Sequence, residues 1–428
     1  MSVALFVVIS LSFLSSTFSL QSSYRCINSD LTFTQPPFIS QADRPEVWTR
    51  NTCEFRNILI SGRTKSFLFY TTKGYGHFGK KSPDDPLLIT SIGNRKNETY
   101  GTHDLVPFPL KLSFESMPNN SWNENNAIVY QPYSAWNIGH LLNDDFFPIY
   151  IAMRAFHFHQ PDLILWLDCS NDWLYPGFVD FVTRCESTLK RWMPILNLSW
   201  TFIDESKDVC FRRVVAGLHS LTWSISKATY GDQLFLGFLY QDMIHKLLHN
   251  LPSSSRLPRQ NTESASHKTL SVLILDKEES SGQAQRKIMN ANEIASFIKD
   301  TFLVHVKVLP LSRNLSVFDE LREIRSSNII LTGDGGAAWT TVFSMENTAV
   351  IYVDWFDHSI NKSRCVECWW STLPYIQTLQ YRLDASEVTG TGRNGENYHL
   401  SLQKIHATFC LVFAQLSFHF EQCMTSVS

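Results

Sequence analysis

Between residues 271 and 353, short apolar runs alternate with stretches of helical spacing, and this alternation restricts the possible folds more than any other feature of the chain. The strand-like runs are SVLIL, VHVKVL, NIIL and AVIYV. Apolar residues at helical spacing lie between them, at 290–298 and 316–324. Strands that alternate with helices of about ten residues form a parallel sheet with right-handed crossovers. The region therefore predicts a Rossmann-like α/β domain.

The rest of the chain shows the same mixture of elements less regularly. A segment at 251–268 has the composition of an interdomain linker, because Ser, Pro and polar residues replace the apolar periodicity there. An apolar stripe at helical spacing through 402–420 predicts a terminal helix that packs back on the core. Strand candidates before the linker are 66–70, 127–130, 163–167 and 213–216, and helical segments are 137–156 and 232–249. We expect an N-terminal α/β lobe at 26–250, the linker at 251–268, a C-terminal Rossmann-like lobe at 269–390 and the C-terminal helix within 391–428.

Length and charge exclude some classes of partner. The chain has 428 residues, of which 44% are hydrophobic and 18% charged, and is long enough for two globular domains. A formal net charge of -3 gives no electrostatic basis for binding a polyanion, and no basic run predicts a membrane-surface patch. We expect no nucleic-acid partner.

The chain begins with an uncharged apolar stretch, MSVALFVVISLSFLSSTFSL, of the kind that directs proteins into the secretory pathway. Residues 1–25 are interpreted as either a cleaved signal peptide or an uncleaved signal anchor, because the stretch is nearly long enough to span a bilayer. We expect the protein in the lumen of the endoplasmic reticulum or Golgi, anchored in the membrane or secreted.

Nine cysteines fit an oxidising compartment, with at least one thiol left over. Cys365 and Cys368 have the spacing of half a zinc site, but no second Cys or His pair follows at finger or ribbon spacing. A disulfide or plain thiols are the favoured interpretation, and no metal-ligand set is predicted. Asn-x-Ser/Thr sequons, which permit glycosylation, occur at Asn97, Asn119, Asn197, Asn314 and Asn361.

A polar group stands in the middle of the apolar segment WNIGHLLNDDFFPIY at 136–150. On an α-helix His140 and Asp144 are four residues apart and share one face. Burying unpaired charges is costly, so this face is expected to line a ligand site or a polar network. His140, Asp144 and Asp145 are the titratable residues of this polar group. The alternative is that His140 and Asp144 pair only to hold the kink that Pro148 predicts.

Two segments of the predicted parallel sheet carry candidate anion-binding groups. TGDGGAAW at 332–339 lies between a strand and a helix, where open parallel sheets bind ligands. Its glycines would let backbone N–H groups approach an anion, although a tight turn explains them equally well. QRKIMNANEI at 285–294 places two cations before a helix, where they suit a diphosphate or only a solvated helix start. Arg286, Lys287, Gly335 and Gly336 are the candidate anion-binding residues. Asn290, Asp334 and Ala337 become candidate ligand-binding residues only through the resemblance of their motifs to those of a known family.

Three motifs resemble, in the same order, those of glycosyltransferase family 61, which includes plant xylan arabinosyl- and xylosyltransferases and the animal EGF-domain and O-mannose N-acetylglucosaminyltransferases. Residues 137–145 are similar to its Asn-x-x-His-x-x-x-Asp element, and RKIMNANEI is similar to its Arg-Arg-Ile-x-Asn-x-x-Glu element. GDGGAAWTTVF resembles its His-Gly-Ala-Gly-Leu-Thr-x-x-x-Phe element. Asp334, Ala337 and Lys287 stand where that family has His, Gly and Arg.

The resemblance implies a GT-B fold, in which two Rossmann-like lobes face each other across a cleft, with the acceptor on the N-terminal lobe and the nucleotide sugar on the C-terminal lobe. It implies an inverting transferase that moves a sugar from a UDP-sugar to a hydroxyl of a glycoprotein or polysaccharide. UDP-N-acetylglucosamine and UDP-pentoses are the candidate donors. The base would be His140, Asp144 or Asp145. Mn²⁺ is a candidate cofactor, because a metal could bridge Asp334 to a phosphate.

A catalytically inactive relative that binds a glycan or a protein is the alternative function. A carboxylate at about 4 Å from a phosphate charge costs on the order of 4 kcal/mol at an effective dielectric of about 20. Asp334 is therefore the position that separates the two functions. A secreted α/β hydrolase is disfavoured, because the chain contains no Gly-x-Ser-x-Gly nucleophile elbow.

Overall fold

The computed structural model describes residues 22–27, 38–39, 52–70, 87–97, 102–113, 115–118, 122–131, 138–165, 179–217, 230–249, 270–277, 286–311, 315–364, 373, 375–390, 396–417 and 423. The apolar stretch at 1–20, the linker at 251–268 and the Cys365–Cys368 pair lie outside these residues. Within the described part of the chain, no helix has the length and hydrophobicity needed to cross a bilayer.

The protein has a mixed α/β fold with parallel strands, as the sequence predicts. The C-terminal sheet is parallel throughout, in the order β12-β11-β13-β14-β17. Four of its strands coincide with the predicted apolar runs, and β13 and β14 are buried at every position. The fifth strand, β17, was not predicted, because it mixes polar and apolar residues at an edge of the sheet. The strands are β11 (Ser271–Lys277), β12 (His305–Leu311), β13 (Ile329–Gly333), β14 (Thr348–Val353) and β17 (Ile376–Tyr381).

Both helices predicted in this region form and connect the strands. Helix α7 (Ala291–Phe302) follows β11 and buries an apolar stripe that includes Ile294 and Ile298. Helix α8 (Val317–Ser326) follows β12. Its N-cap is Ser316, whose hydroxyl accepts a hydrogen bond from the backbone N–H of Asp319 at 3.2 Å. Such caps stabilise a helix by about 1 kcal/mol, so both sequence periodicity and capping fix this segment.

The N-terminal sheet is mixed, and ten strands of it are described, in the order β5-β6-β4-β3-β10-β7-β8-β9 with β1 beside β3 and β2 beside β1. Only β10, β7, β8 and β9 form a run of parallel neighbours. The prediction of a second Rossmann-like lobe is therefore wrong for the other strands. Apart from the parallel pair β4 and β6, these strands have antiparallel neighbours, and the short connection 62–65 joins β3 to β4. The strands are β1 (Ser23–Ile27), β2 (Phe38–Ile39), β3 (Thr52–Ser61), β4 (Ser66–Tyr70), β5 (Leu87–Asn97), β6 (Thr102–Ser113), β7 (Trp122–Tyr130), β8 (Asp162–Leu165), β9 (Trp200–Phe202) and β10 (Asp208–Ala216).

Helices connect the parallel strands of this sheet as well. Helix α2 (Ile138–His140), the π-helix η1 (Leu141–Phe146) and helix α3 (Phe147–Phe156) lie between β7 and β8 in the chain. Helix α4 (Val179–Trp192) and the 3-10 helix η2 (Met193–Leu196) lie between β8 and β9. The segment from β7 to β9 is thus a βαβαβ unit, with the candidate catalytic segment directly after its first strand.

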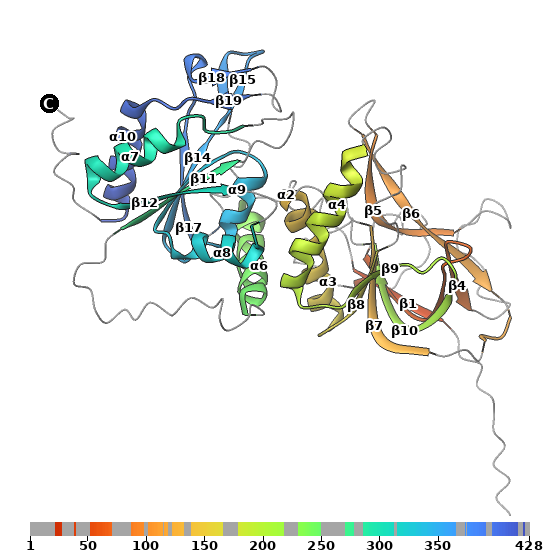
Figure 1. The fold of residues 1–428 in the computed structure, drawn as a ribbon. Coiled ribbons are helices and arrows are strands. Elements are labelled where there is room, and N and C mark those ends of the chain that lie inside the picture. Colours follow the sequence, from red (N-terminus) through yellow and green to blue (C-terminus); the bar gives the residue numbers. More distant parts are fainter. Residues whose placement is uncertain are drawn as a thin grey trace, which may run out of the picture.

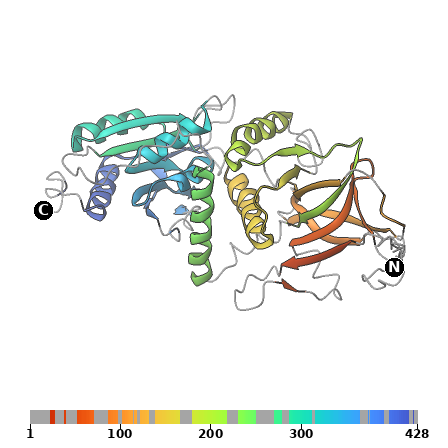
Figure 2. The same cartoon turned by 90° about the horizontal axis from the view of Figure 1, so that it is seen from below.

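Helices fill the space between the two sheets. Figures 1 and 2 show α2, α3 and α4 on the side of the N-terminal sheet that faces the C-terminal sheet, with α6 (Tyr230–His249) beside the latter. One hydrophobic cluster runs through this region and includes Phe147 from α3, Tyr240 from α6 and Ile330 from β13. The rings of Phe147 and Tyr240 are 5.1 Å apart. The two parts of the chain therefore share a continuous apolar core.

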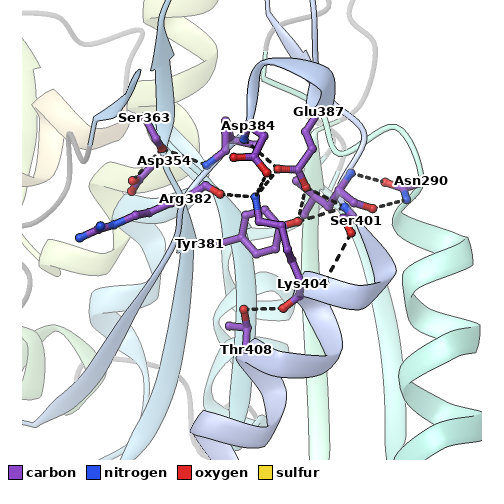
Figure 3. Close-up of polar contacts among 12 residues, drawn as sticks. Asn290, Asp354, Ser363, Tyr381, Arg382, Asp384, Glu387, Ser401, Lys404 and Thr408 are labelled. Carbon is purple, nitrogen blue, oxygen red and sulfur yellow. Dashed lines mark hydrogen bonds and ion pairs between the residues drawn. The ribbon is translucent and has the colours of Figure 1, made fainter. Parts of the chain in front are cut away.

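The predicted C-terminal helix forms as α10 (Leu402–Gln415) and packs on α7 with Ile405, Phe409 and Val412 buried. A polar network holds its first turn (Figure 3). Glu387 accepts hydrogen bonds from the backbone N–H of Ser401 at 2.8 Å and from the side chains of Tyr381 and Lys404. Because Glu387 also lies next to the N-terminal end of α10, its negative charge complements the helix dipole.

Disulfide bonds occur in both parts of the protein. Cys410 in α10 is bonded to Cys423. Cys53 and Cys185 each form a disulfide bond as well. Cys210 is a free, buried thiol. Disulfides, which an oxidising compartment would favour, and the expected leftover thiol are therefore both found among these residues.

Candidate functional site

The segment that carries the candidate catalytic residues is π-helical where an α-helix was predicted. His140 ends α2, and η1 follows at Leu141–Phe146. A proline at position 148 removes an N–H and would press its ring against the carbonyl of Asp144 in a regular α-helix. π-Helical winding, with its i to i+5 hydrogen bonds, accommodates this. The segment between His140 and Pro148 is therefore π-helical in place of the α-helix that the sequence predicts.

Of the three candidate bases, the structure describes the side chain of Asp145 alone. Asp145 is 2% exposed and lies near the buried phenol of Tyr130, whose pKa is raised by burial and by the charge of Asp145. A carboxylate covered in this way would need a change of conformation to meet an acceptor hydroxyl. The side chains of His140, Asn143 and Asp144 lie outside the described part of the structure.

The predicted ligand-binding residues gather at the topological switch point of the C-terminal sheet. After β11 the chain continues to β12 on one side, whereas after β13 it continues to β14 on the other side. Open parallel sheets bind ligands outside the carboxyl ends of the two strands where the direction reverses in this way. Here those ends are Lys277 of β11 and Gly333 of β13, followed by Arg286 and Asp334. Two of the three motifs therefore meet where the fold predicts a ligand.

Asp334 is the centre of the polar contacts at this switch point. It is 1% exposed, and its carboxylate forms an ion pair with the Arg286 guanidinium at 3.0 Å. The Tyr398 hydroxyl donates to its other oxygen at 3.1 Å, and the Lys277 ammonium donates to its backbone carbonyl at 3.0 Å. Burial and the Asp334 charge raise the pKa of Tyr398, so the phenol stays protonated and donates. Asp334 is thus compensated by neighbouring donors.

Glycines let Arg286 approach the turn after β13. A Cβ on Gly335 would lie 2.8 Å from the guanidinium carbon of Arg286, and one on Gly333 would lie 2.9 Å from the Arg286 carbonyl. Gly335 also has φ = 87°, which other residues rarely adopt. The close approach that was predicted for an anion is made in this structure by the Arg286 side chain, which is 13% exposed.

The backbone around Arg286 is fixed by a segment much later in the chain. Residue 288 bridges to Tyr398, the backbone N–H of Met289 donates to the carbonyl of Tyr398 at 2.7 Å, and the N–H of Tyr398 donates to the carbonyl of Lys287 at 2.8 Å. Arg286 itself has φ = 60°. The left-handed conformation of a non-glycine residue is held by these contacts and directs its side chain over the glycine turn.

Asn290, predicted as a ligand-binding residue, has a structural role. Its side-chain nitrogen donates to the carbonyl of Leu400 at 2.9 Å, and its side-chain oxygen accepts from the N–H of Leu400 at 3.0 Å. The residue is 7% exposed and makes no side-chain cap at the N-terminal end of α7. Its amide therefore anchors the segment before α10, as Figure 3 shows, and is not directed to a ligand.

The first motif meets the third through a close helix contact. Gly139, next to His140, approaches Trp339 so closely that a Cβ would lie 2.4 Å from Cδ1 of the indole. Trp339 belongs to α9 (Gly336–Thr340), the short helix that starts with Gly336 and Ala337. All three motifs, separated by up to about two hundred residues, thus adjoin one another.

Four residues at the same sheet edge were not predicted. Lys277 and Asp354 lie at the carboxyl ends of β11 and β14, and Tyr398 and Glu396 come from the segment before α10. Burial raises the pKa of Asp354 to about 6, and burial likewise raises the pKa of Glu396. A rule that selects polar residues at strand ends would have found Lys277 and Asp354. No local sequence signal identifies Tyr398 or Glu396.

Among the described side chains, no group of three or more His, Cys, Asp or Glu residues is arranged to hold a metal ion. Asp334, the residue expected to contribute if Mn²⁺ binds, already pairs with Arg286.

Comparison with known proteins adds little. No protein-family model matches the chain, and no curated protein matches it. Among solved structures, the chain is similar to the bacterial iron-containing dodecameric glycosyltransferase TibC from enterotoxigenic E. coli H10407, with 9% identity over 94% of this chain and 82% of TibC and a TM-score of 0.30. A superposition of that quality carries no argument about function. The resemblance to glycosyltransferase family 61 stays a prediction from the three motifs.

Proposed function

We propose that the protein is a glycosyltransferase of the secretory pathway, with a GT-B-like arrangement, that transfers a sugar from a UDP-sugar to a hydroxyl of a glycoprotein or polysaccharide. One observation carries the proposal. The three motifs that resemble glycosyltransferase family 61 adjoin one another, with Arg286 on the Gly335 turn and Gly139 on Trp339. Random motif matches have no reason to converge at the switch point of a parallel sheet.

The reaction would be a direct displacement at the anomeric carbon. His140 or Asp144 would take the proton of the acceptor hydroxyl, whose oxygen forms the new bond while the bond to the diphosphate breaks and its electron pair leaves with UDP. Arg286 and Lys277 would stabilise the charge on the departing diphosphate. For Arg286 this requires a guanidinium that contacts both Asp334 and the phosphate, which its several donors allow.

The cysteines support a location in the secretory pathway. The Cys410–Cys423 bond and the disulfide-bonded Cys53 and Cys185 are expected in an oxidising lumen and are rare in reducing compartments. An N-terminal segment that acts as signal peptide or anchor would be consistent with this location.

A second candidate function is favoured by the Asp334–Arg286 ion pair. Since a buried carboxylate already satisfies the cation expected to bind the donor, an inactive relative that binds a glycan or a partner protein would retain the same structure. The two functions differ in nucleotide binding, which is the quantity to measure.

The test is calorimetric titration of the luminal chain, residues 26–428, with UDP in the presence and absence of Mn²⁺, followed by transfer assays with UDP-N-acetylglucosamine and UDP-pentoses. A working enzyme binds UDP, and His140→Ala lowers its turnover while UDP affinity stays the same. A strict Mn²⁺ requirement would assign a metal to the donor site. No UDP binding by folded protein in either condition would contradict the transferase and favour the inactive relative.

A further inference from the structure

The contact between α2 and α9 is closer than ordinary helix packing. A Cβ on Gly139 would lie 2.4, 2.5 and 2.8 Å from three atoms of the Trp339 ring, within the distance that real Cβ atoms essentially never show. Gly139 does not have a positive φ, so its backbone conformation does not require glycine. Any side chain at this position would force the Trp339 ring or one of the two helices to shift.

Helix α9 is held firmly on its other sides. The Thr341 hydroxyl, directly after α9, lies 2.8 Å from the Tyr352 hydroxyl on β14. Thr340 contacts Glu320 of α8, and Glu320 forms an ion pair with Arg191 of α4. With α9 fixed to the sheet and to α8, a displacement at Trp339 has to be taken up by α2.

Each of the two residues in this contact lies close in the chain to a group that takes part in the proposed reaction. His140 follows Gly139 in the chain, and the Gly335–Gly336 turn lies within one helical turn of Trp339. The separation between α2 and α9 therefore sets the distance between a candidate base and the glycine turn against which the Arg286 guanidinium packs. A misplacement of about 1 Å between reacting groups can lower a rate on the order of a hundredfold.

We propose that Gly139 and Trp339 are positioning residues that hold the His140-bearing helix at a fixed distance from the donor-binding turn. The inference rests on the proposed transferase function for its catalytic consequence. It goes beyond that function because neither residue needs to touch a substrate.

The experiment compares Gly139→Ala, Trp339→Leu and the double variant with the wild type. In Gly139→Ala we expect turnover to fall on the order of ten- to a hundredfold, with UDP affinity within about twofold of the wild type. In the double variant the methyl group enters the space that the indole leaves, so turnover should recover above that of Gly139→Ala. Trp339→Leu alone controls for the loss of the ring, and thermal unfolding of each variant controls for folding.

Hydrogen exchange of the backbone amides in 138–146, which form α2 and η1, gives a readout that needs no activity. Gly139→Ala should raise their exchange about tenfold, and the double variant should restore protection. If the wild type transfers no sugar, the proposed function fails while hydrogen exchange still decides whether α2 and α9 are coupled. A folded Gly139→Ala protein with wild-type turnover and wild-type exchange would overturn the positioning role, as would a double variant no better than Gly139→Ala in either measurement.

Discussion

At the scale of single residues, Asp334 decides how the candidate site works. Sequence alone placed a negative charge where a diphosphate would bind, and the structure shows that charge buried and shared between Arg286 and Tyr398. In the proposed function, anion binding would depend on Arg286, and Asp334 would limit how much of the Arg286 charge a ligand experiences. The two residues should have opposite effects on nucleotide affinity.

We expect Arg286→Ala to weaken UDP binding about tenfold or more, since it removes a charge-assisted contact of about 1.5–3 kcal/mol. Asp334→Asn should strengthen it, because the amide keeps contacts with Tyr398 and Arg286 without the negative charge. Isothermal titration at constant ionic strength measures both variants, and Lys65→Ala, at a distant surface ion pair, serves as control. Equal affinities in Asp334→Asn and the wild type would show that the carboxylate does not oppose the nucleotide.

The raised pKa of Asp354 predicts that the stability of the folded protein depends on pH. Burial is the main cause that raises its pKa to about 6, and the neighbouring Asp334 charge contributes, whereas Ser363 and Arg382 lower it. The folded state therefore holds a proton between about pH 4 and pH 6 that the unfolded state has released. The contribution of Asp354 to stability is present below its unfolded pKa and is lost as pH rises through about 6.

The full effect is on the order of 2–3 kcal/mol, from a shift of about two pKa units, and about half of it is lost between pH 5 and pH 7.5. Asp354→Asn should remove it, so the variant gains stability relative to the wild type on going from pH 5 to pH 7.5. Urea unfolding at the two pH values measures the change. Parallel pH profiles for wild type and variant would contradict the assignment.

At the scale of elements, α10 depends on Glu387. Burial by itself raises the pKa of Glu387, but hydrogen bonds from Lys404, Tyr381 and the backbone of Asp384 and Ser401 outweigh it, and the pKa is lowered. The carboxylate is therefore worth more to the folded state in its charged form. Its contribution is present above the unfolded pKa of about 4.3 and is lost as pH falls through the lower folded pKa.

Glu387→Gln should destabilise the protein by about 1–3 kcal/mol at pH 7, because Lys404 and two backbone N–H groups lose a charged acceptor. The difference from wild type should shrink as the pH is lowered below about 4. Urea unfolding from pH 3 to pH 7 checks this, with exposed Glu186→Gln as the control. A difference that does not change with pH would show that charge is unimportant here.

At the scale of the whole molecule, the two sheets are joined by a common apolar core and by the Arg191–Glu320 ion pair. Glu320 is 2% exposed, and burial raises its pKa in spite of Arg191 and Thr340. A buried pair is costly to break on one side but can often be replaced as a whole. A continuous core of this kind restricts large movements between the parts.

Removing one partner with Glu320→Ala should cost about 3–5 kcal/mol, whereas Arg191→Met with Glu320→Leu should stay within about 1 kcal/mol of the wild type. Urea unfolding of disulfide-intact protein measures both. A double variant as unstable as Glu320→Ala would show that the attraction within the Arg191–Glu320 pair stabilises the contact between the two parts of the chain. The loss in Glu320→Ala would then not come from an Arg191 charge left without its partner.

The sequence by itself determined the elements whose pattern is local. Apolar runs fixed β11 to β14, helical spacing fixed α7, α8 and α10, and the turn motifs marked Arg286 and Asp334, because periodicity and capping act within about ten residues. The sequence also identified the three motifs that resemble glycosyltransferase family 61. It did not show that the Asn290 side chain would bind the backbone of Leu400.

Tertiary structure decided everything that depends on contacts between distant segments. No local pattern predicts that residues 286–289 pair with Tyr398 or that Gly139 packs against Trp339. The burial of Asp145 likewise depends on distant segments. The π-helix before Pro148 and the mixed order of the N-terminal sheet were likewise outside the reach of periodicity. The physical reason is that a side chain's burial, charge and partners are set by whatever the fold brings beside it, and a linear pattern records only its own neighbours.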